Sequence, residues 1–191
     1  MRLVWRASSC AVAAGWRQQL MDSRDFDPEA MLSALASREV RFVLIGGMAA
    51  VLHGDVGVTV DLDVVPERSD ENLERLARAL RDLGARIRTE GEPEGLRFDC
   101  SAEFFKNLSP DSIVNMTTEG GDLDVTFCPS GTQGFSDLSR DAVEIEAADR
   151  LHILVASLED VIRSKEAAGR EKDRLALPRL RRLLDRLRAD G

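Results

Sequence analysis

Two segments of the sequence place aspartates at alternate positions of an otherwise apolar strand pattern. Residues 58–65 read VTVDLDVV, and residues 122–127 read DLDVTF. Because side chains of a strand alternate between its two faces, each segment presents apolar residues on one face and paired aspartates on the other. Aspartate is disfavoured in strands, and like charges side by side repel, so these carboxylates need a compensating interaction. We therefore expect a sheet with one buried face and one acidic face.

The two acidic faces are expected to meet if the strands are neighbours in the sheet. In the first segment the expected core face consists of Val58, Val60, Leu62 and Val64, and the opposite face of Thr59, Asp61 and Asp63. In the second segment Asp122 and Asp124 share a face. A half-solvated outer surface would explain one such strand. Two strands with the same Asp-x-Asp spacing favour a divalent cation, because Mg²⁺ binds hard oxygen ligands, typically one or two carboxylates plus substrate phosphates.

A Gly-Gly pair follows the apolar run 42–45 (FVLI) and precedes a short helical pattern. At such a turn Gly46 and Gly47 allow the backbone to approach a phosphate closely. The pair is neither a G-x-G-x-x-G fingerprint nor a Walker A loop, and Gly-Gly also forms ordinary turns. Together with the aspartates it favours phosphoryl transfer, in which divalent ions stabilise the attacking and leaving oxygens.

Composition excludes several other classes of protein. The net charge of −8 argues against non-specific binding over the whole surface to nucleic acid or anionic membrane. Cys10, Cys100 and Cys128 are widely spaced and form no CxxC motif, which favours reduced thiols in a cytoplasmic protein. With only His53 and His152, a histidine-rich metal site is not expected, and His53 is interpreted as structural. No run reaches the length of a membrane span.

The order of helix and strand signals predicts an α/β (α+β) protein with a mixed sheet. Residues 1–20 are expected to be a disordered extension, since their apolar stretch is poor in leucine for a signal peptide and is interrupted by Arg6. Residues 21–150 are predicted to form the core and residues 151–191 a helical C-terminal segment that completes a cleft. Residues 85–120 contain no motif.

The whole arrangement resembles the polymerase β-like nucleotidyltransferase superfamily. The resemblance rests on an apolar strand, Gly46-Gly47, and then Asp61 and Asp63 flanked by apolar residues. It implies a nucleotidyltransferase core in which Asp61 and Asp63 bind Mg²⁺ (or Mn²⁺) and a later strand supplies a third carboxylate. Asp124 is the better candidate for that carboxylate, and Asp122 is the alternative.

The C-terminal third resembles the AbiEii- and MenT-type nucleotidyltransferases, which are toxins of toxin–antitoxin pairs. Residues 157–180 read SLEDVIRSKEAAGREKDRLALPRL, and Thr59 matches the Ser/Thr-x-Asp-x-Asp form of that group. The resemblance implies that Lys165 holds the phosphates of the nucleotide and that Asp173 orients either Lys165 or the acceptor. Arg170 would add a phosphate contact. The residues alone also allow a simpler interpretation, in which Lys165 extends from an apolar helix face to solvent.

These observations predict a magnesium-dependent nucleotidyltransferase that transfers NMP from an NTP to an acceptor hydroxyl. The resemblance implies that the acceptor is the 3′ end of tRNA, that the enzyme inhibits growth, and that a cognate antitoxin protein controls it. The basic excess within residues 163–188 could receive an RNA backbone, or it is the solvated face of a helix. Alternative acceptors are an antibiotic hydroxyl or a protein side chain, in AMP transfer. A non-catalytic antitoxin or nucleotide-binding partner is the alternative from another class.

Overall fold

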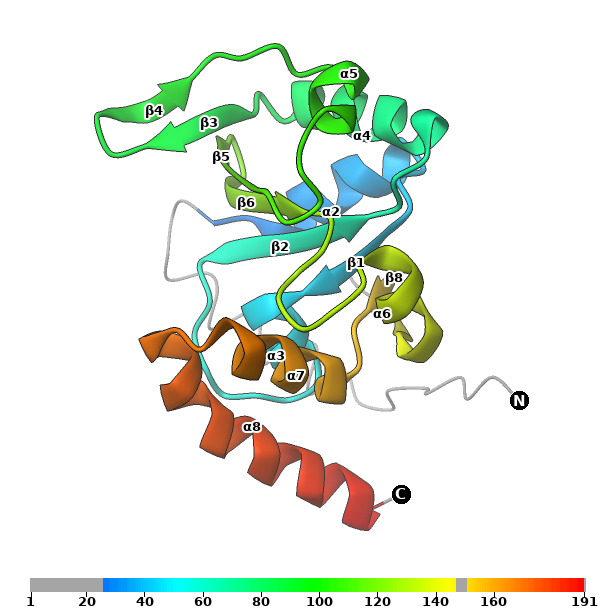
Figure 1. The fold of residues 1–191 in the computed structure, drawn as a ribbon, viewed down its shortest axis with the longest axis vertical. Coiled ribbons are helices and arrows are strands. Elements are labelled where there is room, and N and C mark those ends of the chain that lie inside the picture. The colour runs from blue at the N-terminus through cyan, green and yellow to red at the C-terminus, as the bar shows by residue number, and fades with distance from the viewer. Residues whose placement is uncertain (1–25, 147–150, 191) are drawn as a thin grey trace.

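A mixed β-sheet forms the centre of the fold (Figure 1). This computed structural model describes residues 26–146 and 151–190, so the predicted extension 1–20 lies outside the described residues. Within them, eight strands form one sheet in the order β4-β3-β5-β6-β2-β1-β8-β7. The predicted α/β class, with a mixed sheet and a helical C-terminal part, is confirmed.

The strands are short and alternate with helices along the chain. The strands are β1 (Phe42–Ile45), β2 (Asp61–Pro66), β3 (Arg86–Thr89), β4 (Glu92–Leu96), β5 (Ile113–Thr118), β6 (Gly121–Thr126), β7 (Val143–Glu146) and β8 (His152–Val155). The helices are α2 (Pro28–Ser37), α3 (Gly46–Leu52), α4 (Asp70–Asp82), α5 (Ala102–Lys106), α6 (Phe135–Asp141), α7 (Leu158–Ala168) and α8 (Glu171–Asp190). The strands β3, β4 and β5 and the helix α5 fall in the stretch without a motif, residues 85–120.

Local sequence signals explain where several helices begin. The side chains of Asp27, Ser69 and Ser157 each accept a hydrogen bond from a backbone N–H in the first turn of the helix that follows. Such caps satisfy donors that have no partner inside the helix. Helix α7 ends at Gly169, whose φ of 61° lies in the left-handed region that favours glycine. Helices α2, α4 and α7 therefore each begin directly after a capping residue.

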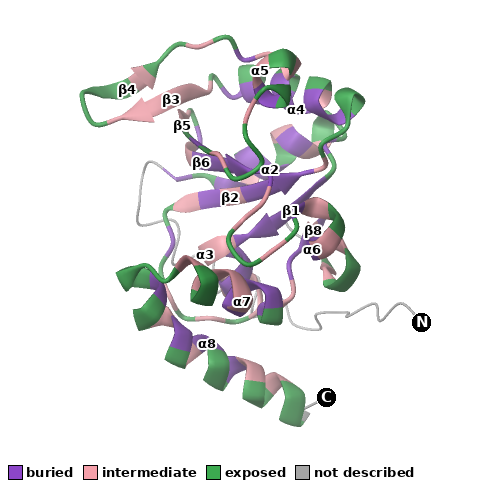
Figure 2. Cartoon of the chain, viewed as in Figure 1, coloured by how far each residue is buried: buried purple, intermediate pink, exposed green. Residues whose placement is uncertain are grey.

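Strand β2 is central and buries one face. Leu62 and Val64 on β2, and Leu123 and Val125 on the adjacent β6, have no exposed surface. Figure 2 shows buried residues concentrated in the central strands, whereas the β3–β4 hairpin and the outer side of α8 are mostly exposed or intermediate. The interior face is thus the apolar face that the alternation predicts.

The predicted core face extends too far toward the N-terminus of this segment. Val58 and Val60 are 77% and 58% exposed, and β2 begins only at Asp61. Pairing with β6 also begins at Asp61, opposite Asp122. Since Val58 and Val60 precede that pairing, they have no neighbouring strand to hold them against the core. The expectation that they belong to the core is wrong.

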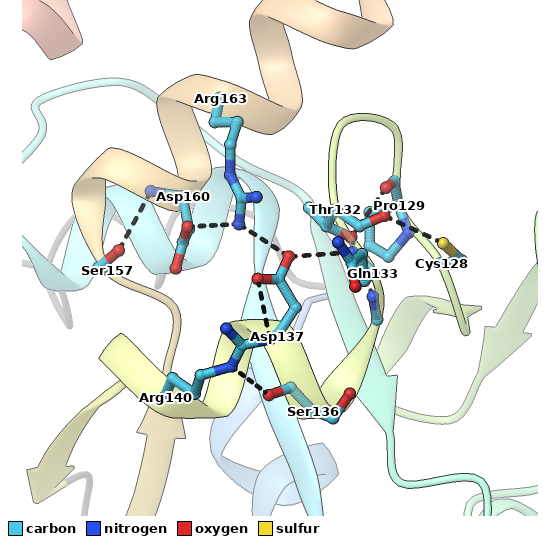
Figure 3. Close-up of polar contacts among 11 residues, drawn as sticks. Cys128, Pro129, Thr132, Gln133, Ser136, Asp137, Arg140, Ser157, Asp160 and Arg163 are labelled. Carbon is cyan, nitrogen blue, oxygen red and sulfur yellow. Dashed lines mark hydrogen bonds and ion pairs between the residues drawn. The ribbon is translucent and has the colours of Figure 1, made fainter.

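Helices α3, α7 and α8 form a connected group, which α3 joins to the sheet. Helix α3 packs against β1, β2 and α7, and α7 packs against α8. Figure 3 shows a polar network between α6 and α7, in which Arg163 donates to Asp160 and Asp137 at 2.6 and 2.9 Å. The backbone N–H of Gln133 donates to the same Asp137 carboxylate at 2.9 Å. This network fixes the position of α7, the helix that contains Lys165.

The last helix runs through a proline without interruption. Pro178 lies inside α8, which continues from Glu171 to Asp190 as one element. Arg179, in the next position, binds the Asp55 carboxylate with two hydrogen bonds, of 2.5 and 2.9 Å. This ion pair ties α8 to the segment between α3 and β2. Among the described residues, no helix is both long enough and apolar enough to cross a bilayer.

Candidate active site

The two Asp-x-Asp strands lie side by side and in register. Strands β2 and β6 are parallel neighbours, with Asp61 opposite Asp122 and Asp63 opposite Asp124. Paired residues of adjacent strands project from the same face of a sheet, so the four carboxylates share one face. The expected convergence of these aspartates is confirmed. Asp124 is the most buried of them, at 9% exposure.

Gly46 and Gly47 provide the space that two of the polar side chains occupy. Gly46 has a φ of +76°, and a Cβ atom there would lie 1.9 Å from Oδ2 of Asp63. A Cβ atom on Gly47 would lie 2.5 Å from Oγ1 of Thr59. Glycine is therefore required at both positions by the close approach of Asp63 and Thr59. This constraint is distinct from the phosphate approach that the sequence suggests, because it comes from side chains of the protein itself.

Thr59 orients Asp61. Its hydroxyl donates a hydrogen bond to Oδ1 of Asp61 at 2.8 Å, and the threonine is only 8% exposed. A hydrogen bond to one carboxylate oxygen restricts the rotation of Asp61 and leaves the other oxygen for another partner. Thr59, Asp61 and Asp63 thus form one unit at the start of β2, next to Gly46 and Gly47.

Asp63 occupies an unfavourable electrostatic position. Its pKa is raised from 3.8 to about 7, first by burial and then by the negative charges of Asp61 and Asp124. The positive charges of Lys165 and Lys172 act in the opposite direction on this pKa. Lys172 is a residue that the sequence interpretation did not single out. A cation bound beside Asp63 would favour its ionised form and lower this pKa.

Lys165 and Asp173 form an ion pair that links α7 to α8. Nζ of Lys165 donates to Oδ1 of Asp173 at 3.0 Å, and Nε of Arg170 donates to Oδ2 at 2.6 Å. Asp173 has no exposed surface. Burial acts to raise the pKa of Asp173, but the hydrogen bonds and the positive charges of Arg170 and Lys165 together outweigh burial and hold this pKa below its usual range. Both side chains are thus largely shielded from solvent, with 16% of Lys165 and 0% of Asp173 exposed.

Arg88 is a member of the cluster that sequence reasoning missed. It extends from β3 and binds Asp124, at 3.0 and 3.3 Å, and also Asp122. Burial raises the pKa of Asp124, and the charges of Asp61 and Asp122 raise it further, while Arg88 opposes them. The one available signal is the alternation in residues 86–89 (RIRT), which places two arginines on one strand face.

The donor chemistry of the site fits Mg²⁺ or Mn²⁺. Among residues 26–146 and 151–190, no group of three or more His, Cys, Asp or Glu side chains is arranged to hold a metal ion. Two carboxylates are enough when phosphates of the substrate complete the coordination. Asp61 and Asp63 are such a pair, and the space at Gly46 admits the Asp63 carboxylate. The third candidate, Asp124, is bound by Arg88.

Comparison with known proteins supports the fold assignment. No family model and no curated protein matches the sequence. The fold is similar to that of LnuA, a lincosamide antibiotic adenylyltransferase solved with lincomycin bound, with a TM-score of 0.53 and 17% identity. That similarity covers 84% of this chain and 99% of LnuA. A Thermotoga maritima protein, whose assignment as a nucleotidyltransferase is itself provisional, is similar with a TM-score of 0.51 and 15% identity, over 84% of this chain and 96% of its own. The chain therefore has a nucleotidyltransferase fold.

Proposed function

We propose that the protein is a magnesium-dependent nucleotidyltransferase, which transfers NMP from an NTP to an acceptor hydroxyl. The observation that supports this proposal most strongly is the register of β2 and β6, which puts Asp61, Asp63 and Asp124 on one face. The adjoining glycines and the Lys165–Asp173 pair add support. A non-catalytic partner would have no need of a buried carboxylate such as Asp63, whose pKa is raised to about 7.

Each residue of the site has a proposed role. Asp61 and Asp63 would hold Mg²⁺ or Mn²⁺, with Asp124 as the third ligand, and the ion would stabilise charge on the α-phosphate of the NTP. Lys165 would hold the phosphates. Asp173 would orient the ammonium group of Lys165.

The remaining residues would position these groups. Arg170, which is 55% exposed at its side chain, would reach a phosphate from the rim of the site. Thr59 would keep Asp61 in one orientation through its hydrogen bond. Gly46 and Gly47 would give the substrate and the carboxylates close access to the backbone. In the reaction the acceptor hydroxyl attacks the α-phosphate, a new P–O bond forms, and pyrophosphate leaves with the electrons of the broken P–O bond.

The acceptor that we propose first is the 3′ end of tRNA, with control by a cognate antitoxin protein in the cytoplasm. The motif resemblance in residues 157–180 supports this acceptor. Blocked tRNA ends could not be aminoacylated, so expression without the antitoxin should arrest bacterial growth, and Asp61→Ala should abolish the arrest. Growth arrest that persists in Asp61→Ala, or harmless expression of the folded wild-type protein with unaltered tRNA ends, would contradict the toxin function.

A second acceptor is favoured by one specific comparison. LnuA is an adenylyltransferase for lincosamide antibiotics, and its whole length aligns with this fold. A small-molecule hydroxyl is therefore the alternative substrate, with the same chemistry at the nucleotide. AMP transfer to a protein side chain is a further variant of that reaction.

One experiment separates these acceptors. The purified protein is incubated with each NTP and Mg²⁺ in the presence of total tRNA, of a lincosamide, or of neither, and the masses of tRNA, lincosamide and protein are measured. We expect the mass of one NMP or more on one acceptor class. Asp61→Asn should lose the transfer, while Asp185→Asn, an exposed aspartate on α8, should retain it. Absence of transfer to every acceptor would overturn the proposed function.

A further inference from the structure

Arg88 lies in a row of polar residues that crosses four strands. The register of β3 with β5 pairs Arg86 with Thr117 and Ile87 with Met116, and its continuation by one residue would bring Arg88 opposite Asn115. Asn115 is paired with Asp124 on β6, and Asp124 with Asp63 on β2. These residues share one sheet face, and the guanidinium reaches over β5 to the carboxylates of β6.

The contact with Arg88 offsets the negative charge of the two aspartates on β6. The two aspartates on β2, Asp61 and Asp63, still repel each other. Arg88 binds Asp122 and Asp124, whose side chains are 36% and 12% exposed. A guanidinium that binds two carboxylates at partly buried positions makes charge-assisted hydrogen bonds of the strong kind. Within residues 26–146 and 151–190, no lysine or arginine forms an ion pair with Asp63, and Lys165 donates to Asp173 instead. Of the three proposed metal ligands, Asp61, Asp63 and Asp124, it is therefore Asp124 that already has a cationic partner.

We propose that Arg88 is a built-in counter-ion that competes with the divalent cation for Asp124, so that the cation gains its third carboxylate only when the guanidinium releases it. This inference rests on the proposed function, because the cation is the one proposed there. Two positive charges cannot share one carboxylate at close range without repulsion. Arg88 thus lowers the affinity of the protein for the cation alone.

The neighbouring arginine provides a matched control. Arg86 lies on the same strand and the same face, but it pairs at 3.5 Å with Glu94 of the exposed hairpin, whose side chain is 87% exposed. Within the part of the chain that the structure describes, Arg86 forms no ion pair with Asp61, Asp63, Asp122 or Asp124. Substitution of Arg86 removes the same charge from the same strand without freeing Asp124.

The test is a calorimetric titration of Mn²⁺ into the full chain without nucleotide, at pH 8. We expect Arg88→Gln and Arg88→Ala to bind Mn²⁺ roughly tenfold more tightly than wild type, because each removes the positive charge that competes for Asp124. Arg86→Gln should bind as wild type does. Affinity that is unchanged or weaker in both Arg88 variants would overturn the competition.

A double variant keeps the test decisive if repulsion between Asp122 and Asp124 unfolds the single variants. Arg88→Gln combined with Asp122→Asn removes one positive and one negative charge, so the summed charge at positions 88, 122 and 124 stays the same. We expect this double variant to bind Mn²⁺ more tightly than Asp122→Asn alone, and equal affinity would overturn the competition. If the Arg88 variants bind Mn²⁺ with the affinity of wild type and still transfer NMP, the competition is wrong but the proposed function stands. No Mn²⁺ binding by any variant would count against the proposed metal site as well.

Discussion

At the residue scale, the site is defined by how closely small and acidic residues approach each other. Gly46 is required because Asp63 fills the space where its Cβ atom would be. Asp63 in turn has a raised pKa because it is placed there beside Asp61 and Asp124. Such a mutual constraint is typical of functional sites, where strain and repulsion are tolerated for the sake of a ligand.

The first prediction concerns Gly46. Gly46→Ala should destabilise the protein by about 3 kcal/mol or more, because it combines a positive φ with a contact of 1.9 Å to Asp63. Gly54→Ala is the control, since Gly54 has a φ of +99° but its Cβ atom would meet nothing closer than 4.0 Å. It should cost about 1 to 2 kcal/mol. Urea unfolding measures both, and equal losses would show that the Asp63 contact is unimportant.

The second prediction concerns the charge of Asp63. Its pKa is about 7 in the folded protein against 3.8 ordinarily, so between these values the folded state binds more protons than the unfolded state. The free energy of unfolding should therefore fall as the pH rises from about 4 to about 7. Asp63→Asn removes this cost and should be more stable than wild type at pH 8 without cations.

The measurement is a set of unfolding curves in EDTA at pH 5, 6, 7 and 8. The difference in stability between Asp63→Asn and wild type should shrink toward pH 5, where Asp63 is protonated in the folded protein. Asp185→Asn, at an exposed position, should follow the wild-type curve throughout. A difference that does not depend on pH would contradict a raised pKa at Asp63.

At the element scale, the segment between α3 and β2 is held from the outside by α8. Asp55 is 5% exposed at its side chain and accepts two hydrogen bonds from Arg179, whose atoms also lie against Gly57. Between this anchor and the Thr59–Asp61 hydrogen bond, Val56 and Val58 are exposed. The segment that leads into the carboxylates is thus fixed at two points rather than by an apolar core.

The third prediction concerns this anchor. Asp55→Ala should cost about 2 kcal/mol, because the buried carboxylate and both hydrogen bonds are lost. It should also increase amide hydrogen exchange in residues 56–60. Arg181→Ala provides a control on the same helix, since the Arg181–Glu166 pair is 59% and 44% exposed and should contribute less than about 1 kcal/mol. Exchange that is unaffected by Asp55→Ala would show that α8 does not hold the segment.

At the scale of the whole molecule, segments far apart in the chain meet at one face of the sheet. Asp61 and Asp63 come from β2, Asp124 from β6, Lys165 from α7 and Asp173 from α8. The unfolded chain has no such arrangement. A ligand that needs all of these groups binds only the folded state and must stabilise it.

The fourth prediction follows from this linkage. Mg²⁺ with NTP at about 100 times its Kd should add about 2.7 kcal/mol, which raises the Tm by roughly 5 to 10 °C for a chain of this size. Asp61→Asn should largely remove the increase, and Asp185→Asn should preserve it. A Tm that does not respond to Mg²⁺ and NTP in the wild-type protein would argue against the site.

Local sequence alone was sufficient for the features that depend on near neighbours. Caps such as Ser69 and Ser157 act within one turn of their own helix, so the neighbouring sequence is enough to explain where that helix begins. The face of Asp61 and Asp63 follows from the period of two in a strand. The place of Lys165 on the apolar face of its helix follows from the helical period.

Long-range pairing decided the remaining features. Val58 and Val60 continue the apolar alternation, but they are exposed because pairing with β6 begins at Asp61. Arg88 reaches the carboxylates because β3 lies two strands from β6, and the order of strands in a sheet is not written in any one of them. The close approach of Gly46 to Asp63 likewise depends on the pairing of β1 with β2. Periodicity tells which face a side chain takes, whereas only the packed sheet determines what it meets there.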